Sequence, residues 1–439
     1  MSKLVGPWLC GLFDSDRASA RAVKESLLKV FKSEEKLGAI WKTLEAEILA
    51  FCRATVVSET VHTLSDERWV GPDDAEAKFA RVMATCCLAV AHLISTQDLE
   101  PLETSYAQFL GEKTLWAFAF HPDSFLRRVV YRLLLDALGK RPQWIAANLE
   151  MVATALVVKA SAKPQLGSAS AYLEALTALT RQLPEAWTVA KPARKKTPLA
   201  QFVSFVGQGS QLAPPTYWAQ VSGLFAALPK DALAVKDETA KNTIVGILAG
   251  IKAGPEPKSH LMAAWNCYWD VCYLFLELQQ PSQSDSGDNS VIRQSLLPVY
   301  EGYLWGSSPN EQHIISKDDT VAAAICASGL MKLDRLSNDS ASKLLSGLWK
   351  KMEDAVVDAV KAERRDAAAN EAPVKRCGRA WAKLVAGVLE LRPPKDGFVH
   401  GALVESSVAI LAELIESLLA TNGILLVQLC FAVPPLTAL

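Results

Sequence analysis

The sequence predicts an all-α fold, an irregular solenoid of helical repeats that winds as an α-α superhelix. The first observation is a unit in which an apolar segment ends at an Asp-containing turn and an amphipathic segment follows. This unit occupies Leu4–Phe31 and recurs over Leu115–Leu138, with matching offsets at Asp16 and Asp123. The second is apolar spacing at i, i+3, i+4 and i+7 along almost every stretch, without strand-type alternation. A recurring helix–turn–helix unit indicates stacked repeats.

Glycine and proline residues delimit the predicted helices. After the Gly71-Pro72 break, Asp73 and Glu76 have the spacing of a capping box that starts a helix over Ala75–Ile94. The remaining helices are predicted over Trp144–Lys159, Ala171–Leu183, Trp218–Leu228, Asp237–Lys252, Leu261–Leu278, Lys350–Ala367 and Arg379–Leu391. The short apolar run Val203–Val206 fits either a helix or a strand.

Composition divides the chain into segments. These are N-terminal repeats over 1–160, further repeats over 161–278 that include the Gly207–Ser210 turn, a mobile polar loop over 279–290, further repeats over 291–423, and an apolar tail over 424–439. Ala368–Lys375 contains Pro373 and is predicted as a loop between helices. The tail is shorter than the roughly 20 apolar residues that cross a bilayer. We therefore expect a packing segment or an end of doubtful origin, and no membrane partner.

Bulk composition excludes several function classes. With 439 residues, a net charge of −1 and a pI near 6.6, the chain has no overall field that favours nucleic acid, so RNA contact needs a local basic face. None of the nine cysteines forms a C-x-x-C pair, which predicts reduced, buried thiols in the cytoplasm or nucleus. Cys267 and Cys272 point apart on a helix, so no zinc site is predicted. The six scattered histidines suggest no catalytic residue, and no cofactor is expected.

The repeated Asp and Arg positions have a structural interpretation. We expect Asp16 and Asp123 to cap the helices that follow them by accepting free amide hydrogen bonds. Arg21 and Arg128 are expected to pair with an Asp of a neighbouring repeat and so form a ladder along the array.

Two further groups are candidates for phosphate contact. Arg127, Arg128 and Arg132 place three cations near one helix face, where a solvated face is the alternative. Gly207, Gln208, Gly209 and Ser210 follow an apolar run, but the Lys of a phosphate-binding loop is missing. A tight turn between helices is favoured there, with an exposed contact loop as the alternative. Trp265 and Trp269, at i and i+4, favour core packing over a partner-binding aromatic patch.

Four stretches resemble the N-terminal region of one family, the listerin E3 ubiquitin ligases. They are VGPWLCGLFDSDR (Val5–Arg17), ARAVKESL (Ala20–Leu27), TLSDERWVGPDDAEAKFARV (Thr63–Val82) and GQGSQLAPPTYW (Gly207–Trp218). The resemblance runs from about Lys3 to about Asn422 and is strongest in the N-terminal half and to fungal members. It implies HEAT/ARM-like repeats and a longer protein, whose family carries helical sequence before Val5. Met1 therefore starts inside a folded region, and the isolated chain is expected to be poorly soluble.

The resemblance also implies a function. In the family, the N-terminal domain docks on the large ribosomal subunit near a quality-control partner that recognises the peptidyl-tRNA of a stalled chain, and the ligase marks that chain with ubiquitin. A C-terminal zinc-binding RING recruits the E2 enzyme. No RING pattern occurs in this chain, so we expect it to be inactive as a ligase on its own, with no cofactor.

Ribosome or partner contacts are expected from basic residues and the glycine turn. The candidates are Arg127, Arg128, Arg132, Arg194, Lys195, Lys196, Gly207, Gln208, Gly209 and Ser210, with Lys140 and Arg141 beside them. Reversing the charges of Arg194, Lys195 and Lys196 should weaken subunit binding and flatten its salt dependence. The alternative function is a generic helical-repeat scaffold, a transport receptor or assembly platform, that binds another protein. A third possible function is that of an all-helical enzyme, which no residue pattern supports.

Overall fold

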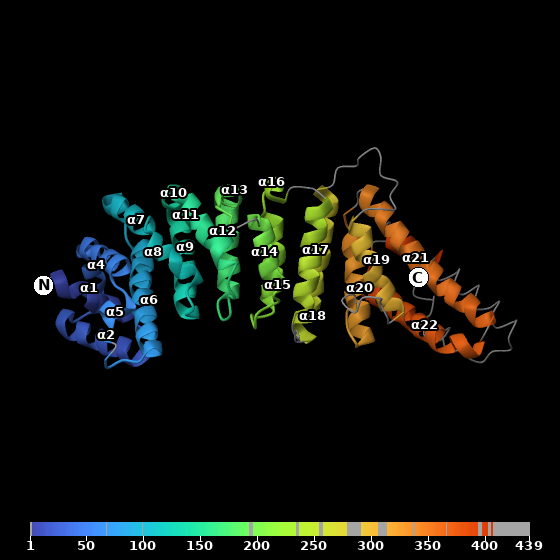
Figure 1. The fold of residues 1–439 in the computed structure, drawn as a ribbon, viewed down its shortest axis with the longest axis horizontal. Coiled ribbons are helices and arrows are strands. Elements are labelled where there is room, and N and C mark those ends of the chain that lie inside the picture. The colour runs from blue at the N-terminus through green and yellow to red at the C-terminus, as the bar shows by residue number, and fades with distance from the viewer. Residues whose placement is uncertain are drawn as a thin grey trace. The chain divides into compact units, whose positions relative to one another are not determined.

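The computed structural model describes most of the chain. The described residues are 2–66, 68–98, 100–192, 196–233, 237–253, 258–278, 291–305, 314–336, 339–365, 367–393, 397–402 and 405–406. Within these ranges the regular elements are all helices, which confirms the all-α prediction (Figure 1). They form two compact units, Met1–Leu233 (unit 1) and Ala234–Leu439 (unit 2), so the division falls inside the predicted 161–278 segment. The predicted polar loop over 279–290 and the tail over 424–439 lie outside the described residues.

Unit 1 is a two-layered helical solenoid. One layer is a row of helices, each packed on the next: α4 (Glu45–Ser58), α6 (Pro72–Thr96), α9 (Ser124–Lys140), α12 (Ala169–Gln182) and α15 (Thr216–Ala227). The connecting layer contains α7 (Glu103–Leu110), α8 (Lys113–Ala117), α10 (Pro142–Ala146), α11 (Leu149–Ala153), the π-helix η4 (Thr154–Ala160), α13 (Ala186–Val189) and α14 (Pro198–Val206). Because each helix contacts mainly its neighbours, the unit is a stack of repeats.

Short elements complete unit 1. The N-terminal ones are α1 (Ser2–Cys10), the 3-10 turn η1 (Gly11–Phe13), α2 (Arg17–Phe31), α3 (Glu34–Thr43) and α5 (Val61–Leu64). The others are η2 (Glu100–Leu102), η3 (Phe118–Phe120) and α16 (Lys230–Leu233). Helix α1 packs on both α4 and α6, so it belongs to the first repeat.

Helix α9 illustrates how the sequence produces this packing. Its apolar residues recur every three or four positions, and those at Leu126, Val130, Leu134 and Leu138 are all buried. That spacing forms one stripe along a helix, which faces α6 and α12. Burial of each such side chain stabilises the fold by about 1.5–3 kcal/mol relative to exposure, so the stripe fixes the stacking of three repeats.

Unit 2 has the same helix-on-helix construction. Its helices are α17 (Asp237–Lys252), α18 (Lys258–Leu278), α19 (Val291–Trp305), α20 (Asp319–Asp334), α21 (Asp339–Arg365) and α22 (Ala367–Glu390). Trp265 and Trp269 of α18 are fully buried, and the Trp269 indole donates to the Ile325 carbonyl oxygen at 3.2 Å. The Trp269 ring also stacks on Tyr300. The core-packing interpretation of this tryptophan pair is confirmed.

Helix α6 begins differently from the prediction. It starts at Pro72 rather than at Ala75, with Gly71 as the N-cap residue and no side-chain cap. The prediction of a capping box at Asp73 and Glu76 is therefore wrong, since Asp73 already lies in the first helical turn. Proline is suited to the first helical position because its fixed φ matches the helix and its missing amide needs no partner.

Two other predicted elements are also corrected. Trp144–Lys159 is not one helix, because the chain turns at Asn148, whose backbone leaves the helical region, and then continues through the π-helix η4. Ala368–Lys375 is not a loop but part of α22. Alanine has the highest helix propensity, and α22 packs against α19 and α20. Together these offset the hydrogen bond that Pro373 removes. The ambiguous run Val203–Val206 is helical, within α14.

Within the described ranges, α6 is the helix long and apolar enough to cross a membrane. It packs against α4 and α9, and more than half of its most apolar stretch is buried inside unit 1. Its apolar character therefore serves the core of the repeat stack.

Candidate functional site: the loop edge of unit 1

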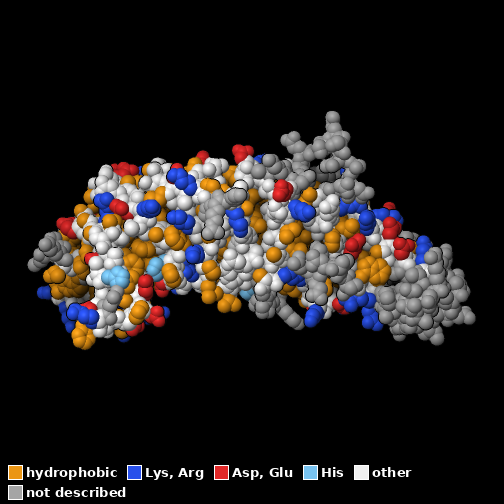
Figure 2. Space-filling model, in the orientation of Figure 1, with side chains coloured by type: hydrophobic (Ala, Val, Ile, Leu, Met, Phe, Trp, Pro, Cys, Tyr) orange, Lys and Arg blue, Asp and Glu red, His pale blue; other side chains and the backbone are white. Residues whose placement is uncertain are grey.

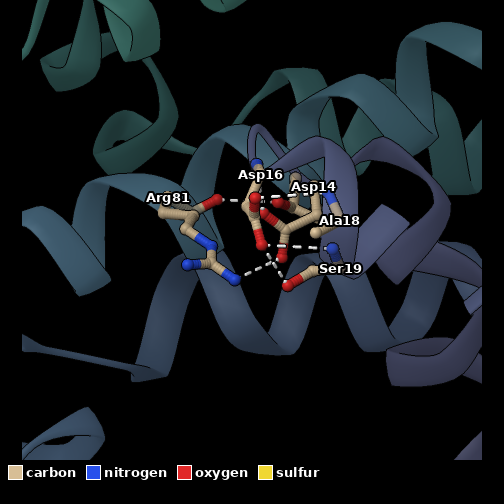
Figure 3. A network of polar contacts seen from close by, with 6 residues as sticks. Asp14, Asp16, Ala18, Ser19 and Arg81 are labelled. Carbon is tan, nitrogen blue, oxygen red and sulfur yellow. Dashed lines mark hydrogen bonds and ion pairs between the residues drawn. The ribbon is translucent and has the colours of Figure 1, made fainter. Parts of the chain in front are cut away.

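The first predicted cap is present in the turn between η1 and α2 (Figure 3). The Asp16 carboxylate accepts hydrogen bonds from the amides of Ala18 and Ser19 at 3.2 and 3.1 Å, and from the Ser19 hydroxyl at 2.6 Å. The Ser19 hydroxyl is the largest cause that holds the pKa of Asp16 below its usual value, followed by the two amides. The expected N-cap role of Asp16 is thereby confirmed.

The cation beside this turn comes from a different helix than expected. Arg81 of α6 forms an ion pair with Asp14 at 2.7 Å, and Asp14 also accepts from the Asp16 amide at 2.9 Å (Figure 3). Arg21 is exposed and makes no hydrogen bond or ion pair within the described part of the chain. The pairing of Arg21 with a neighbouring Asp is replaced here by the contact of Arg81, which α6 carries directly over the turn.

The second copy of the turn holds a buried arginine. Asp123 caps α9 by accepting from the Leu126 amide at 2.7 Å, as expected. Arg127 is only 4% exposed. Its guanidinium donates to the carbonyl oxygens of His121, Pro122 and Leu166 and to the Ser168 hydroxyl, at 2.6–2.8 Å. Burial lowers the pKa of Arg127.

Arg127 is therefore a brace between two loops rather than a phosphate contact, and its prediction as a surface residue is corrected. Four of its five N–H donors are directed at oxygens inside the protein, and the side chain is buried, so Arg127 is not displayed to a partner. Arg132 lies on the exposed side of α9 and pairs with Asp136 at 2.9 Å. The three arginines predicted on one face thus divide between the interior and the surface.

Arg128 reaches the next loop as well. It is exposed, donates to the carbonyl oxygen of Gly167, and lies over the Phe125 ring rather than beside an Asp. Gly167 adopts φ +73°, and a Cβ at this position would meet the Ser124 side chain at 3.1 Å. A side chain at this position would be strained both by the left-handed backbone and by this contact, so glycine is favoured. The contact of Arg128 therefore differs from the expected ladder, because the neighbouring repeat offers a carbonyl at this position.

The Gly207–Ser210 segment forms the predicted tight turn between α14 and α15. Gly209 has φ +81°, and Ser210 is buried, which leaves Gln208 as the exposed member of the four. The two residues that follow, Gln211 and Leu212, also have positive φ, at 52° and 61°. The Gln211 side chain accepts from the Gln165 amide at 2.6 Å, which ties this turn to the preceding loop.

These contacts join three consecutive loops, 121–123, 161–168 and 207–215, which precede α9, α12 and α15. Together with the described residues 65–66 and 68–71 before α6, they are here called the loop edge. In Figure 1 the loops before α12 and α15 are visible at the lower ends of these helices. Among the residues that the structure describes, three of the most exposed large apolar side chains belong to it, namely Trp69 (83%), Leu166 (54%) and Leu212 (90%). Figure 2 shows hydrophobic atoms at this lower rim in the middle of the molecule.

Lys140 and Arg141 lie at the opposite edge. Lys140 ends α9 and is about 18 Å from Arg128 along the helix axis, given 1.5 Å per residue. Arg141 follows it and approaches Glu100 at 3.7 Å. Lys196 lies just before α14, whereas the glycine turn lies just after this helix. The Lys196 ammonium donates a hydrogen bond to the Ser204 hydroxyl. Arg194 and Lys195 lie outside the described residues. On the face drawn in Figure 2, the Lys and Arg residues of unit 1 are dispersed among Asp and Glu.

A second cluster was not predicted from the sequence. Cys10, Cys52 and Cys86 come from α1, α4 and α6, and their sulfur atoms lie within 4.8 Å of one another. The thiols are 42 and 34 positions apart in sequence, so no local spacing reveals them. The only sequence signal is that each lies on an apolar stretch, and the packing of α1 on α4 and α6 was needed to bring them together.

The fold defines a class: over the described residues, unit 1 is a solenoid of stacked helical repeats, an architecture whose extended surfaces commonly bind other molecules. Its sequence then specifies the family. The profile described as E3 ubiquitin-protein ligase listerin, N-terminal domain, matches residues 1–228, which is nearly all of unit 1. The chain belongs to this listerin family.

Similar proteins agree with that assignment. An E3 ubiquitin-protein ligase listerin of Neurospora crassa is 27% identical over 418 residues, covering 93% of this chain and 25% of the relative. The Gallus gallus listerin is 20% identical over 80% of this chain. The Schizosaccharomyces pombe listerin is 37% identical over 101 residues, or 23% of this chain. The chain spans about a quarter of the length of the Neurospora relative.

Proposed function

We propose that this chain is the ribosome-docking N-terminal part of a listerin-type E3 ubiquitin ligase, and that the loop edge of unit 1 is its docking surface. Its partners are the large ribosomal subunit with a stalled peptidyl-tRNA and the quality-control protein that recognises that peptidyl-tRNA. Marking of the stalled chain with ubiquitin belongs to the whole ligase, whose E2 enzyme binds through a zinc-containing RING. The proposal places this chain in the cytoplasm.

One observation carries the proposal. The family profile ends at residue 228, close to the end of unit 1 at Leu233, so the family's N-terminal domain and this solenoid are the same body. Within it, the loop edge holds Leu166 and Leu212, and the guanidinium of Arg128, on α9, reaches this edge at the Gly167 carbonyl oxygen. Exposed apolar side chains often mark an interaction site, and a cation beside them can contact phosphate, which supports docking on a ribonucleoprotein.

The test is co-sedimentation of the chain with purified large subunits that carry a stalled peptidyl-tRNA, over a series of salt concentrations. We expect saturable, salt-sensitive pelleting of the wild-type chain. The double variant Leu166→Asp, Leu212→Asp should reduce it at least tenfold. Val189→Asp is the matched control, because Val189 is also exposed but lies on α13 at the opposite edge. This control should pellet like the wild type.

A second pair of variants tests the electrostatic part. Arg128→Gln with Arg132→Gln should lower the slope of log K against log salt by up to about two. Lys140→Gln, on the same helix at the opposite edge, should leave the slope unchanged. If Arg194→Glu, Lys195→Glu and Lys196→Glu together weaken binding instead, the loop edge is not the docking surface. Absence of pelleting, together with co-purification of a non-ribosomal protein, would favour the helical-repeat scaffold.

A further inference from the structure

Three cysteine thiols converge in the first repeat of unit 1. Cys10 ends α1, Cys52 lies in the middle of α4 and Cys86 in the middle of α6. All three are buried, with exposures of 0–3%. The sulfur atoms of Cys10 and Cys52 are 3.6 Å apart, and each of the three lies within 4.8 Å of the other two.

We propose that Cys10, Cys52 and Cys86 form a three-thiolate binding site for a trivalent thiophilic element, filled by arsenic(III) supplied as arsenite. This site is independent of the loop edge and of the proposed docking function, since it lies between the first helices of the stack.

The donor atoms restrict the ligand to soft elements. Thiolates bind soft metals and metalloids, whereas hard ions such as Mg²⁺ and Ca²⁺ require oxygen ligands. The spacing is also suitable. Arsenic(III) with three sulfur ligands is pyramidal, and bonds of about 2.3 Å at angles of about 100° imply sulfur atoms about 3.5 Å apart. The observed separations of 3.6 Å to at most 4.8 Å need an adjustment of no more than about 1.3 Å.

Charge balance then selects among soft ions. Zn²⁺ in a structural site takes four ligands, whereas the group found among the described residues contains three. Three thiolates would leave a net charge of −1 with zinc and −2 with Cu(I), and an uncompensated buried charge costs several kcal/mol. With a trivalent element the complex is neutral. Arsenite has three hydroxyl groups, each replaced by one cysteine sulfur. The three thiol protons and three hydroxides leave as three water molecules, with no change of oxidation state.

Occupation of the site would join three helices. The element would fasten α1 to α4 and α6, and would stabilise the first repeat by mass action because the unfolded chain lacks the preformed cluster. Access requires a local opening of the helices around the buried thiols, and such openings occur more readily than global unfolding.

The experiment uses the full chain, fully reduced and without oxygen, titrated with arsenite. We expect one arsenic atom per chain by elemental analysis, a rise in melting temperature, and protection of Cys10, Cys52 and Cys86 from alkylation when the modified peptides are mapped. Cys52→Ala should lower arsenite affinity at least a hundredfold. Cys87→Ala is the matched control, because Cys87 is equally buried and next to Cys86 but outside the cluster; it should bind like the wild type.

Retention of arsenite by Cys52→Ala, or loss of binding in Cys87→Ala, would overturn the proposal. So would stoichiometric uptake of Cu(I) or Zn²⁺ on these three cysteines in protein that does not take up arsenite. If Cys52→Ala does not fold, the alkylation map of the wild-type chain decides alone, since protection of any other set of cysteines contradicts the assignment.

Discussion

The two copies of the Asp turn share a cap but differ in what surrounds it. Asp16 and Asp123 each accept an amide hydrogen bond from the third residue that follows. In each copy the residue two positions earlier, Asp14 or His121, accepts from the amide of the capping Asp itself. The hydrogen-bonding pattern of the turn is therefore the same in both copies, and it depends on the local sequence alone.

The difference lies four residues beyond the cap. Ala20 occupies that position in the first copy, whereas the second has Arg127, whose guanidinium reaches Leu166 and Ser168 in the next loop. In the first copy a surface ion pair from Arg81 to Asp14 is the connection to another helix. The same turn can thus be joined to neighbouring elements either by a surface ion pair or by hydrogen bonds to buried carbonyl oxygens. The buried hydrogen bonds should stabilise the fold much more than the surface ion pair.

The largest expected effect comes from removing the buried brace. Arg127→Met keeps most of the apolar stem but leaves carbonyl oxygens of His121, Pro122 and Leu166 without their donor. We expect a loss on the order of 3 kcal/mol in the free energy of unfolding of unit 1. Arg21→Met should change it by less than about 0.5 kcal/mol. Denaturant titration, monitored by hydrogen exchange at residues 165–168, measures the free energy of unfolding of both variants. Equal effects of the two substitutions would remove the distinction between the copies.

The cap of the second copy should matter less than its brace. Asp123→Ala removes the acceptor for the Leu126 amide and should cost about 1 kcal/mol, while Asp123→Ser should recover most of that loss. Asp16→Ala should also be destabilising, and by a smaller amount because its carboxylate is exposed. Thermal melts of the four proteins test this order. A larger loss at Asp16 would show that the first turn carries more of the stack than its exposure indicates.

The surface ion pair should contribute little. Asp14→Asn keeps an oxygen that can accept the Asp16 amide and removes the pair with Arg81, whose pKa is raised by that partner. Because the Arg81 side chain is 46% exposed, we expect a loss of about 0.5 kcal/mol or less, which disappears at high salt. Unfolding curves in low and high salt provide the comparison. A salt-independent loss would contradict an electrostatic origin.

The smallest effect is confined to the pH dependence. Burial lowers the pKa of His121. A base with a depressed pKa in the folded state favours folding above its unfolded value of about 6.5, and this stability is lost as the pH falls through the lower folded value. His121→Asn keeps an acceptor for Asp123. Its melting temperature should therefore fall less than that of the wild type between pH 7.5 and 5.5.

The remaining acid sensitivity of His121→Asn should come from His92, whose pKa burial also lowers and which lies between Phe13 and Trp41. An unchanged pH profile would show that His121 does not titrate differently in the folded chain.

Local chemistry was predictable from the sequence, whereas relations between repeats were not. The caps at Asp16 and Asp123 follow from residues within four positions, and the helix over Asp237–Lys252 has the predicted bounds. Arg127 illustrates the limit. Its spacing on α9 suggested a surface cation beside Arg128, but its position against the following loop depends on how α9 and α12 stack. No pattern along one helix contains that information.

The candidate site shows the same division. A turn at Gly207–Ser210 was evident from composition, but the exposure of Leu212 depends on the left-handed backbone of two residues without glycine's freedom. The cysteine cluster was missed for a related reason, because three helices distant in sequence contribute one thiol each. The family resemblance identified the protein class, yet it carried no information on which side chains face outward.

The left-handed pair Gln211 and Leu212 has a consequence for selection experiments. Each such non-glycine residue costs roughly 1–2 kcal/mol relative to ordinary backbone, and the hydrogen bond from the Gln165 amide to Gln211 helps to hold the conformation. A library screened only for heat resistance should therefore enrich asparagine or glycine at position 212 and discard the leucine. If the loop edge is the docking surface proposed above, a library screened for attachment to ribosomes should retain the leucine. The difference between the two selected populations at position 212 would then separate the requirements of folding from those of docking.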